Sequence, residues 1–421
     1  MKIAFVSQPW ECMAVPHLGS VEIVTYGIAS RLARRGHNVV VCARQSRNTS
    51  KQEDRDGLRI VRFPVLHEDR LLSPLEGLLF RQSLPLVASW MYAPAYIHQV
   101  ARYLSGQRFD IIHVQNFSQF VPVLRRYNPS AKIVLHMHCH WLCQFDREEI
   151  ARRLDQTDAI AGCGSHVTEK VRARFGELSA RCFTVHNGID VDEFVGHAGT
   201  AEDGQSRNQR LLFVGRLSPE KGVHFIVESF LRIADRFPDA ELNIVGPDWV
   251  ATKLLKFDLS DDALTRDLAG FTEPYGDFVR RLAQTQGNQR ITFTGFVPCD
   301  GMPALYARHS LLVCASLCHE AFPLPVIEAM ASALPVVGTR SGGVVEQVDD
   351  GRTGVLVERG DVPALSNAMA SLLGNPERIA RMGEAARERA IDLFSWSAII
   401  PQWEHLYEKL CHGAAANQCA G

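Results

Sequence analysis

Short apolar runs alternate with amphipathic helical segments along almost the whole chain, and this alternation limits the fold to the parallel α/β class. Lys2–Ser7 and Val39–Ala43 are two such runs, and the segment from Ser20 between them carries apolar residues at helical spacing. Asp110–Val114 and Lys132–Met137 continue the pattern. The sequence therefore predicts parallel strands that are joined by helices.

The chain divides into two such series. At 421 residues it is longer than one hydrophobic core usually supports. Residues 196–209 are mainly small and polar without periodicity, and a new apolar run follows at Leu211–Val214. We therefore predict a Rossmann-like domain over residues 1–195, a linker over 196–209 and a second Rossmann-like domain over 210–395.

Composition excludes several classes of protein. Hydrophobic residues at 46%, charged residues at 22% and a net charge of −2 are typical of a globular protein and give no electrostatic reason to expect nucleic acid as a partner. No secretory signal opens the sequence, and no apolar stretch reaches transmembrane length. Eleven cysteines, an odd and scattered set, indicate a reducing compartment, so we expect a cytoplasmic protein.

Two clusters of histidine and cysteine could suggest a metal site. They are His136, His138, Cys139, His140 and Cys143, and then Cys314 with Cys318. The first lacks the paired Cys-x2-Cys spacing of structural zinc sites, and reduced packing cysteines explain both clusters better. We predict no metal.

Two glutamates stand on either side of a predicted helix start. Leu311–Cys314 is an apolar run that predicts a strand; Glu320 would lie on the loop after it, and Glu328 in the helix that begins near Pro325. The backbone N–H groups of Leu324, Val326 and Ile327 are expected to point out of this helix start without partners. Such a terminus attracts anions.

Two cations follow another predicted strand. Arg216 and Lys221 lie on the loop between Leu211–Val214 and the next helix, where both could reach one anion. The alternative is a surface pair bridged to Glu220.

These motifs together resemble the retaining glycosyltransferases of family 4. The matching residues are Gly215-Arg216-x4-Lys221-Gly222, Glu320-x7-Glu328 followed by Ala329-Met330, Pro335-Val336-Val337, and Gly342-Gly343-x-x-Glu346. The resemblance implies the glycosyltransferase-B (GT-B) architecture, in which two Rossmann-like domains face each other across a cleft. It also implies that the terminal helix, residues 396–411, returns to the first domain.

The resemblance assigns roles to particular residues. Arg216 and Lys221 would contact the donor phosphates, Glu320 the hydroxyls of the sugar, and Glu328 the ribose. His138, at the end of a strand, would face the donor sugar. His136 or His140 could occupy this position instead if the register differs, and the alternative for each is a histidine that simply packs in the core. The remaining donor-binding residues would be Gly19, Gly215, Phe296, Val297, Phe322, Pro323, Leu324, Pro325 and Val326.

Some positions leave alternatives open. Gly19-Ser20 resembles a glycine loop beside the donor phosphates, or is an ordinary helix start capped by Ser20. Pro323 stands where many relatives have glycine, and Pro325 removes another N–H, so fewer amides can hold the sugar.

The expected activity is metal-independent transfer of a hexose from a nucleoside diphosphate sugar, UDP-linked before GDP-linked, without a cofactor. The acceptor could be a saccharide, a lipid-linked sugar or a small metabolite. Apolar and aromatic residues over 63–103 leave open a peripheral contact with a membrane. A nucleotide-sugar 2-epimerase and a non-catalytic nucleotide-sugar-binding protein are the alternatives.

Overall fold

The computed structural model describes residues 1–17, 19–66, 72, 75–194, 209–248, 257–271, 273–285 and 289–418. The chain forms two compact units, which are Met1–Gly188 with Trp396–Gly421, and Ile189–Ser395. The first boundary falls at Gly188 rather than at the predicted residue 195. Residues 196–208 of the predicted linker lie outside the described residues.

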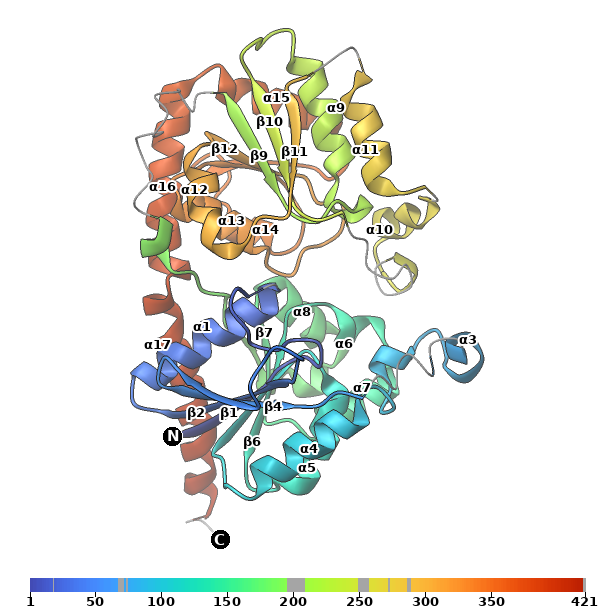
Figure 1. Ribbon diagram of the computed structural model, residues 1–421, viewed down its shortest axis with the longest axis vertical. Coiled ribbons are helices and arrows are strands. Elements are labelled where there is room, and N and C mark those ends of the chain that lie inside the picture. Colours follow the sequence, from blue (N-terminus) through green and yellow to red (C-terminus); the bar gives the residue numbers. More distant parts are fainter. Residues whose placement is uncertain are drawn as a thin grey trace. The chain divides into compact units, whose positions relative to one another are not determined.

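Unit 1 is built on an eight-stranded sheet in the order β3-β4-β2-β1-β5-β6-β7-β8 (Figure 1). Every pairing is parallel except that of β3 with β4. The strands are β1 Lys2–Val6, β2 Asn38–Arg44, β3 Gln52–Arg55, β4 Leu58–Phe63, β5 Ile111–Gln115, β6 Lys132–Met137, β7 Ala159–Gly162 and β8 Cys182–Thr184. The helices are α1 Ser20–Arg34, α3 Glu76–Leu79, α4 Pro94–Ser105, α5 Val121–Tyr127, α6 Trp141–Gln144, α7 Arg147–Leu154, α8 Ser165–Arg174 and α17 Trp396–Gln418.

Unit 2 is built on a six-stranded parallel sheet in the order β11-β10-β9-β12-β13-β14. The strands are β9 Arg210–Val214, β10 Glu241–Val245, β11 Ile291–Gly295, β12 Leu311–Cys314, β13 Val336–Thr339 and β14 Gly354–Val357. The helices are α9 Val223–Ile233, α10 Ala263–Asp267, α11 Tyr275–Ala283, α12 Met302–Ala307, α13 Leu324–Ala331, α14 Val344–Gln347, α15 Val362–Leu373 and α16 Pro376–Phe394.

In both sheets the chain adds strands first on one side of its first strand and then on the other side. In unit 2 the chain adds β10 and β11 on one side of β9 and then crosses to place β12 on the other side. In unit 1 the same reversal separates β2 and β4 from β5 around β1. The loops at the carboxyl ends of the two strands that flank such a switch point diverge, and open α/β sheets bind ligands there.

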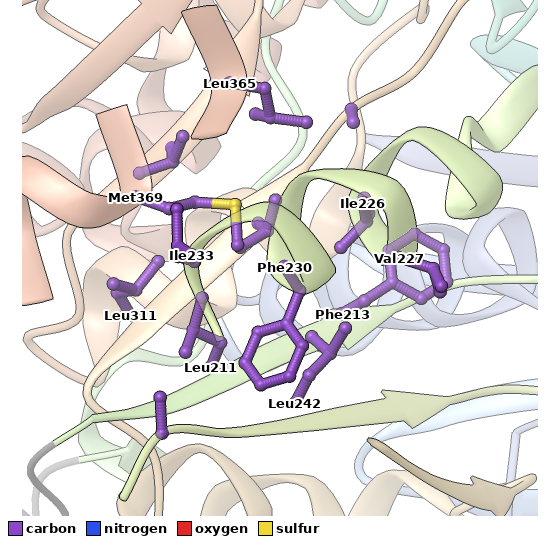
Figure 2. Packing of buried hydrophobic residues seen from close by; sticks show 14 of the residues in the cluster. Leu211, Phe213, Ile226, Val227, Phe230, Ile233, Leu242, Leu311, Leu365 and Met369 are labelled. Atoms are coloured by element: carbon purple, nitrogen blue, oxygen red, sulfur yellow. The ribbon is translucent and has the colours of Figure 1, made fainter. Parts of the chain in front are cut away.

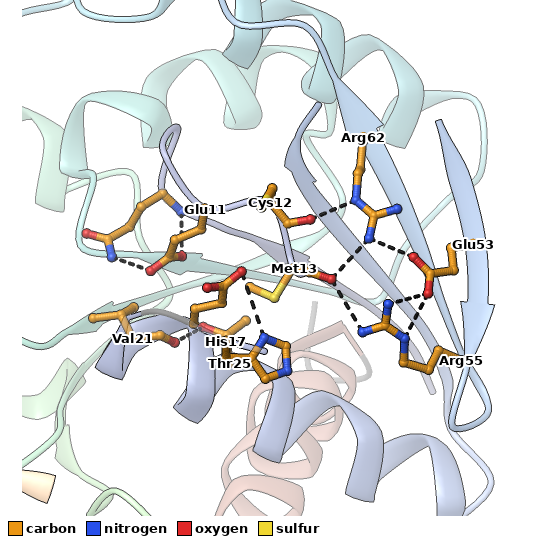
Figure 3. A network of polar contacts seen from close by, with 11 residues as sticks. Glu11, Cys12, Met13, His17, Val21, Thr25, Glu53, Arg55 and Arg62 are labelled. Atoms are coloured by element: carbon orange, nitrogen blue, oxygen red, sulfur yellow. Dashed lines mark hydrogen bonds and ion pairs between the residues drawn. The ribbon is translucent and has the colours of Figure 1, made fainter. Parts of the chain in front are cut away.

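The strands that the sequence predicted are present, but β3 and β4 were missed. Arg59 and Arg62 interrupt the apolar pattern of β4. The guanidinium of Arg62 is buried, and it donates to the backbone oxygens of Cys12 (2.7 Å) and Met13 (3.0 Å) and to the carboxylate of Glu53 (2.7 Å), as Figure 3 shows. A paired and hydrogen-bonded charge can be buried in a strand, which the hydrophobic pattern alone does not reveal.

The core of unit 2 lies between its sheet and the helices α9 and α15 (Figure 2). The buried face of α9 includes Ile226, Phe230 and Ile233, which lie at helical spacing. They pack with residues of β9, β10, β12 and α15, which include Leu211, Phe213, Leu242, Leu311, Leu365 and Met369. Burial of each such side chain contributes about 1.5–3 kcal/mol, so this face fixes α9 and the loop that precedes it.

Helix α17 belongs to unit 1, as the resemblance predicted, and it lies beside α1 (Figure 1). Glu404 accepts hydrogen bonds from Arg35 (2.8 Å) and His37 (3.1 Å). The Tyr407 hydroxyl lies 2.6 Å from Nδ1 of the buried His113 on β5. The helix ends at Gln418, beyond the predicted end at residue 411. Among the described residues, no helix is long and apolar enough to cross a membrane.

The indole of Trp396 fixes the start of α17 against two glycines. A Cβ atom added to Gly27 on α1 would lie 2.2 Å from Cζ2 of Trp396, and one added to Gly188 would lie 2.3 Å from Cε3. Both distances are far below van der Waals contact, so the ring occupies space that only glycine leaves open.

We predict that Gly27→Ala destabilises the protein. Overpacking costs about 1–3 kcal/mol, whereas the intrinsic helix propensity of alanine returns at most about 1 kcal/mol. The measurement is the free energy of unfolding in urea. Gly77→Ala is the matched control, because no described atom lies within 4 Å of its added Cβ. Equal stability of the two variants would show that Trp396 does not need this space.

Candidate active site

The loop after β9 packs directly on the loop after β12. Gly222 ends the first loop with a φ of +65°, and a Cβ atom at this position would lie 2.0 Å from the backbone oxygen of Ala315. Only glycine tolerates both the left-handed conformation and this approach. A similar contact joins Gly246, after β10, to the backbone oxygen of Gly215. The carboxyl ends of β9, β10 and β12 therefore meet in one tightly packed layer.

An ion pair crosses the switch point between these loops. Nζ of Lys221 lies 2.6 Å from Oε1 of Glu320, and the hydroxyl of Ser316 donates to the same oxygen at 2.5 Å. Both charged side chains are largely buried. Burial acts to lower the pKa of Lys221, but the charge of Glu320 opposes it and the pKa is raised overall. Lys221 is therefore charged at neutral pH and is held toward the loop after β12.

Arg216 is the second cation of the same loop. Its guanidinium lies 3.2 Å from the carboxylate of Glu220. The predicted alternative, a surface pair bridged to Glu220, is present in part: Arg216 is bridged to Glu220, but Glu220 is fully buried and Lys221 pairs with Glu320 instead. Arg216 lies close enough to Lys221 for its charge to act on the pKa of that lysine. The two cations lie on one loop, as the sequence predicted, and each pairs with its own glutamate.

The glycine pair after β13 supports the loop that carries Glu320. Gly342 has a φ of +47°, and a Cβ atom there would lie 2.1 Å from the backbone oxygen of Glu320. The N–H of Gly343 donates to that same oxygen at 2.8 Å. From the other side, Arg359 donates to the backbone oxygen of Leu317 at 2.8 Å. These contacts fix the position of the Glu320 backbone relative to the sheet.

Glu328 lies on the first turns of α13 and is bound to a tyrosine. The buried hydroxyl of Tyr306 donates to Oε2 of Glu328 at 2.7 Å. The pKa of Glu328 is raised to about 7: burial raises it most, the hydrogen bond from Tyr306 partly opposes this, and the charge of Glu193 adds to the rise. This carboxyl group therefore titrates close to neutral pH.

The start of α13 differs from the prediction in one respect. The N–H of Val326, which we expected to be without a partner, donates to the backbone oxygen of Pro323 at 3.3 Å. The helix begins at Leu324 after Pro323, so this bond belongs to its first turn. The side chains of Phe322, Leu324 and Val326 are buried. Any contact of these three residues with a ligand would therefore use backbone atoms.

The predicted base-reading pair lies after the edge strand β11. Phe296 is 50% exposed, and Val297 beside it is half-buried. Their strand is two positions from β9 in the sheet, and its carboxyl end lies at the same edge as Gly215 and Arg216.

The remaining predicted residues belong to unit 1. His138 is half-buried just after β6. Nε2 of its ring lies 2.8 Å from Oε1 of Gln115, and its backbone N–H donates to Oδ1 of Asn116 at 2.7 Å. Burial lowers the pKa of His138 to about 3, so the imidazole is neutral. His136 is fully buried in the core, and His140 precedes α6 on the loop.

Gly19 is the residue that precedes α1, and Ser20 is the first residue of the helix. No side chain caps this helix start within the described part of the chain. The alternative of a cap by Ser20 is therefore wrong.

The structure adds Ser316, Gln115 and Asn116 as polar residues that the sequence did not reveal as part of the site, and it shows that Tyr306 binds Glu328. Ser316 and Tyr306 hold the two glutamates, and Gln115 and Asn116 hold His138. Gln115, Asn116 and Ser316 end or follow parallel strands. This position at the carboxyl end of a strand was the signal that could have identified them as site residues. Ser316 and Glu320 are 4 positions apart, but the other partners are separated by 22 or 23 positions in the chain, so no local pattern links them. Among the described residues, no cluster of three or more histidine, cysteine or acidic side chains could hold a metal ion.

Comparisons with known proteins identify the architecture. A family model described as "Glycosyltransferase Family 4" matches residues 21–193, and one described as "Glycosyl transferases group 1" matches residues 202–389. The chain belongs to the family 4-like glycosyltransferases of the GT-B architecture. The glycosyltransferase is 25% identical to spore coat protein SA of Bacillus subtilis, over 97% of this chain and 100% of that protein.

Two solved structures show the same fold as this glycosyltransferase. Sucrose-phosphate synthase of Thermosynechococcus elongatus has a TM-score of 0.73 at 22% identity and covers 98% of this chain and 99% of its own. HepE of Anabaena, in complex with UDP and glucose, has a TM-score of 0.67 at 18% identity and covers 96% and 99%.

We predict that Tyr306→Phe raises the pKa of Glu328 in the glycosyltransferase above 7. The variant removes the hydrogen bond that stabilises the carboxylate, while burial and Glu193 continue to favour the neutral form. A carbon-13 NMR titration of labelled glutamate carboxyls measures the change. Tyr275→Phe is the control, since that buried hydroxyl contacts His224 instead. An unchanged or lower pKa of Glu328 in Tyr306→Phe would contradict the assignment.

Proposed function

We propose that this glycosyltransferase transfers a hexose from a nucleoside diphosphate sugar to a hydroxyl acceptor, with retention of the anomeric configuration and without a metal ion. The observation that carries the proposal is the Lys221–Glu320 pair across the switch point of unit 2, with Arg216 on the same loop. A cationic and an anionic group at adjoining positions suit a substrate whose diphosphate is anionic and whose sugar donates hydroxyl hydrogen bonds.

The donor would be bound along the carboxyl edge of the unit 2 sheet. Arg216 and Lys221 would contact the diphosphate, Glu320 the sugar hydroxyls, and Glu328 the ribose. Backbone groups at Phe296 and Val297 would read the base. We favour UDP over GDP as the nucleotide, because the structural relative HepE is in complex with UDP and glucose.

Charge decides how the leaving group is stabilised. One cation about 4 Å from a phosphate is worth about 4 kcal/mol at an effective dielectric near 20, before desolvation. Lys221 and Arg216 are already paired with carboxylates, so the loss or weakening of these ion pairs offsets part of the energy gained from the phosphate. Two preorganised cations in a partly buried loop still supply the positive charge that a divalent ion supplies elsewhere.

The chemistry that we propose is a front-face displacement. The bond between the anomeric carbon and the β-phosphate oxygen breaks, and the acceptor oxygen binds the same face of that carbon. The acceptor proton moves to the leaving phosphate. His138 and Gly19 of unit 1 would face the reacting sugar and phosphates by their resemblance to the family, and the neutral imidazole of His138 can accept a hydrogen bond or donate one.

The test of this function is incubation with UDP-hexoses and GDP-hexoses. We expect slow release of free hexose, which proton NMR should detect first as the anomer of the donor. An epimerised nucleotide sugar would indicate the isomerase, and unchanged donor despite binding would indicate a non-catalytic binder. Glu320→Gln should lower the rate at least about ten-fold while UDP affinity changes less than about three-fold, because its contact serves the sugar rather than the nucleotide. Equal losses of rate and UDP affinity would contradict that role.

We also predict that Arg216→Ala and Lys221→Ala weaken UDP binding at least about ten-fold, or 1.4 kcal/mol, and leave uridine binding nearly unchanged. Calorimetry with both ligands makes the measurement. Arg236→Ala is the matched control, because this exposed arginine lies after α9, at the opposite end of that helix from the loop. Unchanged UDP affinity in both variants would disprove the phosphate contacts.

A further inference from the structure

At the switch point of unit 1, amide side chains rather than charged side chains join the two flanking loops. The side-chain nitrogen of Asn116, which follows β5, donates to Oε1 of Gln8, which follows β1, at 3.1 Å. Oδ1 of Asn116 accepts the N–H of His138. Residues 7–11 and 115–120, which form the two flanking loops, contain no lysine or arginine. This edge of the sheet is therefore suited to a neutral, hydroxyl-rich ligand rather than to a phosphate.

An exposed tryptophan stands beside these amides on a buried aromatic base. The ring of Trp10 is 44% exposed and contacts the fully buried ring of Phe117 edge-on, with centroids 5.2 Å apart. Trp141 packs edge-on against Phe117 at 5.6 Å, and Tyr92 stacks on it at 5.8 Å. Phe117 directly follows Asn116, so the aromatic group lies next to the bonds that hold His138. An indole that faces solvent from a packed base offers a flat apolar surface.

The loop that carries Trp10 is held rigid. Gln8 donates to the carboxyl group of Glu11 from its backbone N–H (3.2 Å) and from its amide (2.7 Å). The N–H of Arg44 donates to the backbone oxygen of Glu11 at 2.8 Å, and Arg62 donates to Cys12 and Met13 further along the loop. Burial raises the pKa of Glu11 to about 8, which favours the neutral form of this carboxyl group near pH 7. Trp10 can thus bind a ligand without first being ordered.

We propose that a pyranose ring of the acceptor stacks on Trp10, with its hydroxyl rim turned toward the half-buried imidazole of His138, which the buried amides of Gln115 and Asn116 hold in place. The apolar C–H face of a pyranose fits the electron-rich face of an indole. The hydroxyls fit a neutral imidazole, because Nδ1 of His138 can accept a hydrogen bond when Nε2 donates to Gln115. The inference rests on the proposed function, because glycosyl transfer requires an acceptor hydroxyl next to the residue that faces the donor sugar. It assigns the acceptor to the saccharides, free or lipid-linked, among the classes that the sequence left open.

The test measures binding of simple pyranosides by saturation-transfer NMR, with and without saturating UDP. The probes are the methyl α- and β-glycosides of glucose, galactose, mannose and N-acetylglucosamine. Glycerol and myo-inositol serve as hydroxylated compounds without a pyranose ring. We expect at least one pyranoside to bind with millimolar affinity and the two other compounds not to bind. Trp10→Ala should weaken that binding at least about ten-fold, and Trp10→Phe, which keeps an aromatic face, should weaken it less.

Trp90→Ala is the matched control. Trp90 is 75% exposed, and within the described part of the chain no ring contact joins it to Phe117. Its loss should leave pyranoside binding unchanged. The proposal is overturned if no pyranoside binds, or if Trp10→Ala binds as well as the wild type or as Trp90→Ala. UDP binding is measured in the same samples, so that loss of the acceptor site with intact UDP binding is distinguished from failure of the donor assignment.

Discussion

The pair of Lys221 and Glu320 joins two loops that the sheet topology forces apart. β9 and β12 are neighbours, but the chain leaves them in opposite directions, so nothing in the sheet itself fixes one loop against the other. The ion pair does so together with the N–H of Leu317, which donates to the backbone oxygen of Glu220 at 2.8 Å, and the close approach of Gly222 to Ala315 brings the loops near enough for both to form. Breaking one partner of such a largely buried pair would leave a charge without compensation, which is costly.

The two units use the same topology for different chemistry. In unit 2 the switch point carries arginine, lysine and glutamate, whereas in unit 1 it carries glutamine, asparagine and aromatic rings. Both sets are supported from below by bonds to the backbone, from Gly343 to Glu320 in unit 2 and from Arg62 to Met13 in unit 1. The shared scaffold holds a loop rigid, and the residue types on that loop decide whether the edge attracts charge or neutral hydroxyls.

Patterns that are local in the chain were readable from the sequence. The apolar runs predicted both parallel sheets, and the positions of Arg216, Lys221 and Glu320 after predicted strands assigned them to the two loops that meet at the switch point. Features that depend on distant residues were not readable. The strand β4 was hidden because Arg62 finds its partners on the loop after β1 and on β3. The bonds of Asn116 to Gln8 and His138 span 108 and 22 positions, so the unit 1 edge gave no motif. The N–H of Val326 was misjudged because its partner, Pro323, depends on where the helix begins.

The position of α17 sets an order for biosynthesis. Unit 2 is one continuous stretch, Ile189–Ser395, whereas unit 1 needs the first 188 residues and the helix that starts at Trp396. On the ribosome, all of unit 2 is made before the chain supplies Trp403 and Tyr407, which fill the core of unit 1. Domains fold as units during synthesis, so the part made first completes its core last. Until then, the surface of unit 1 around His113 stays open to water and to chaperones.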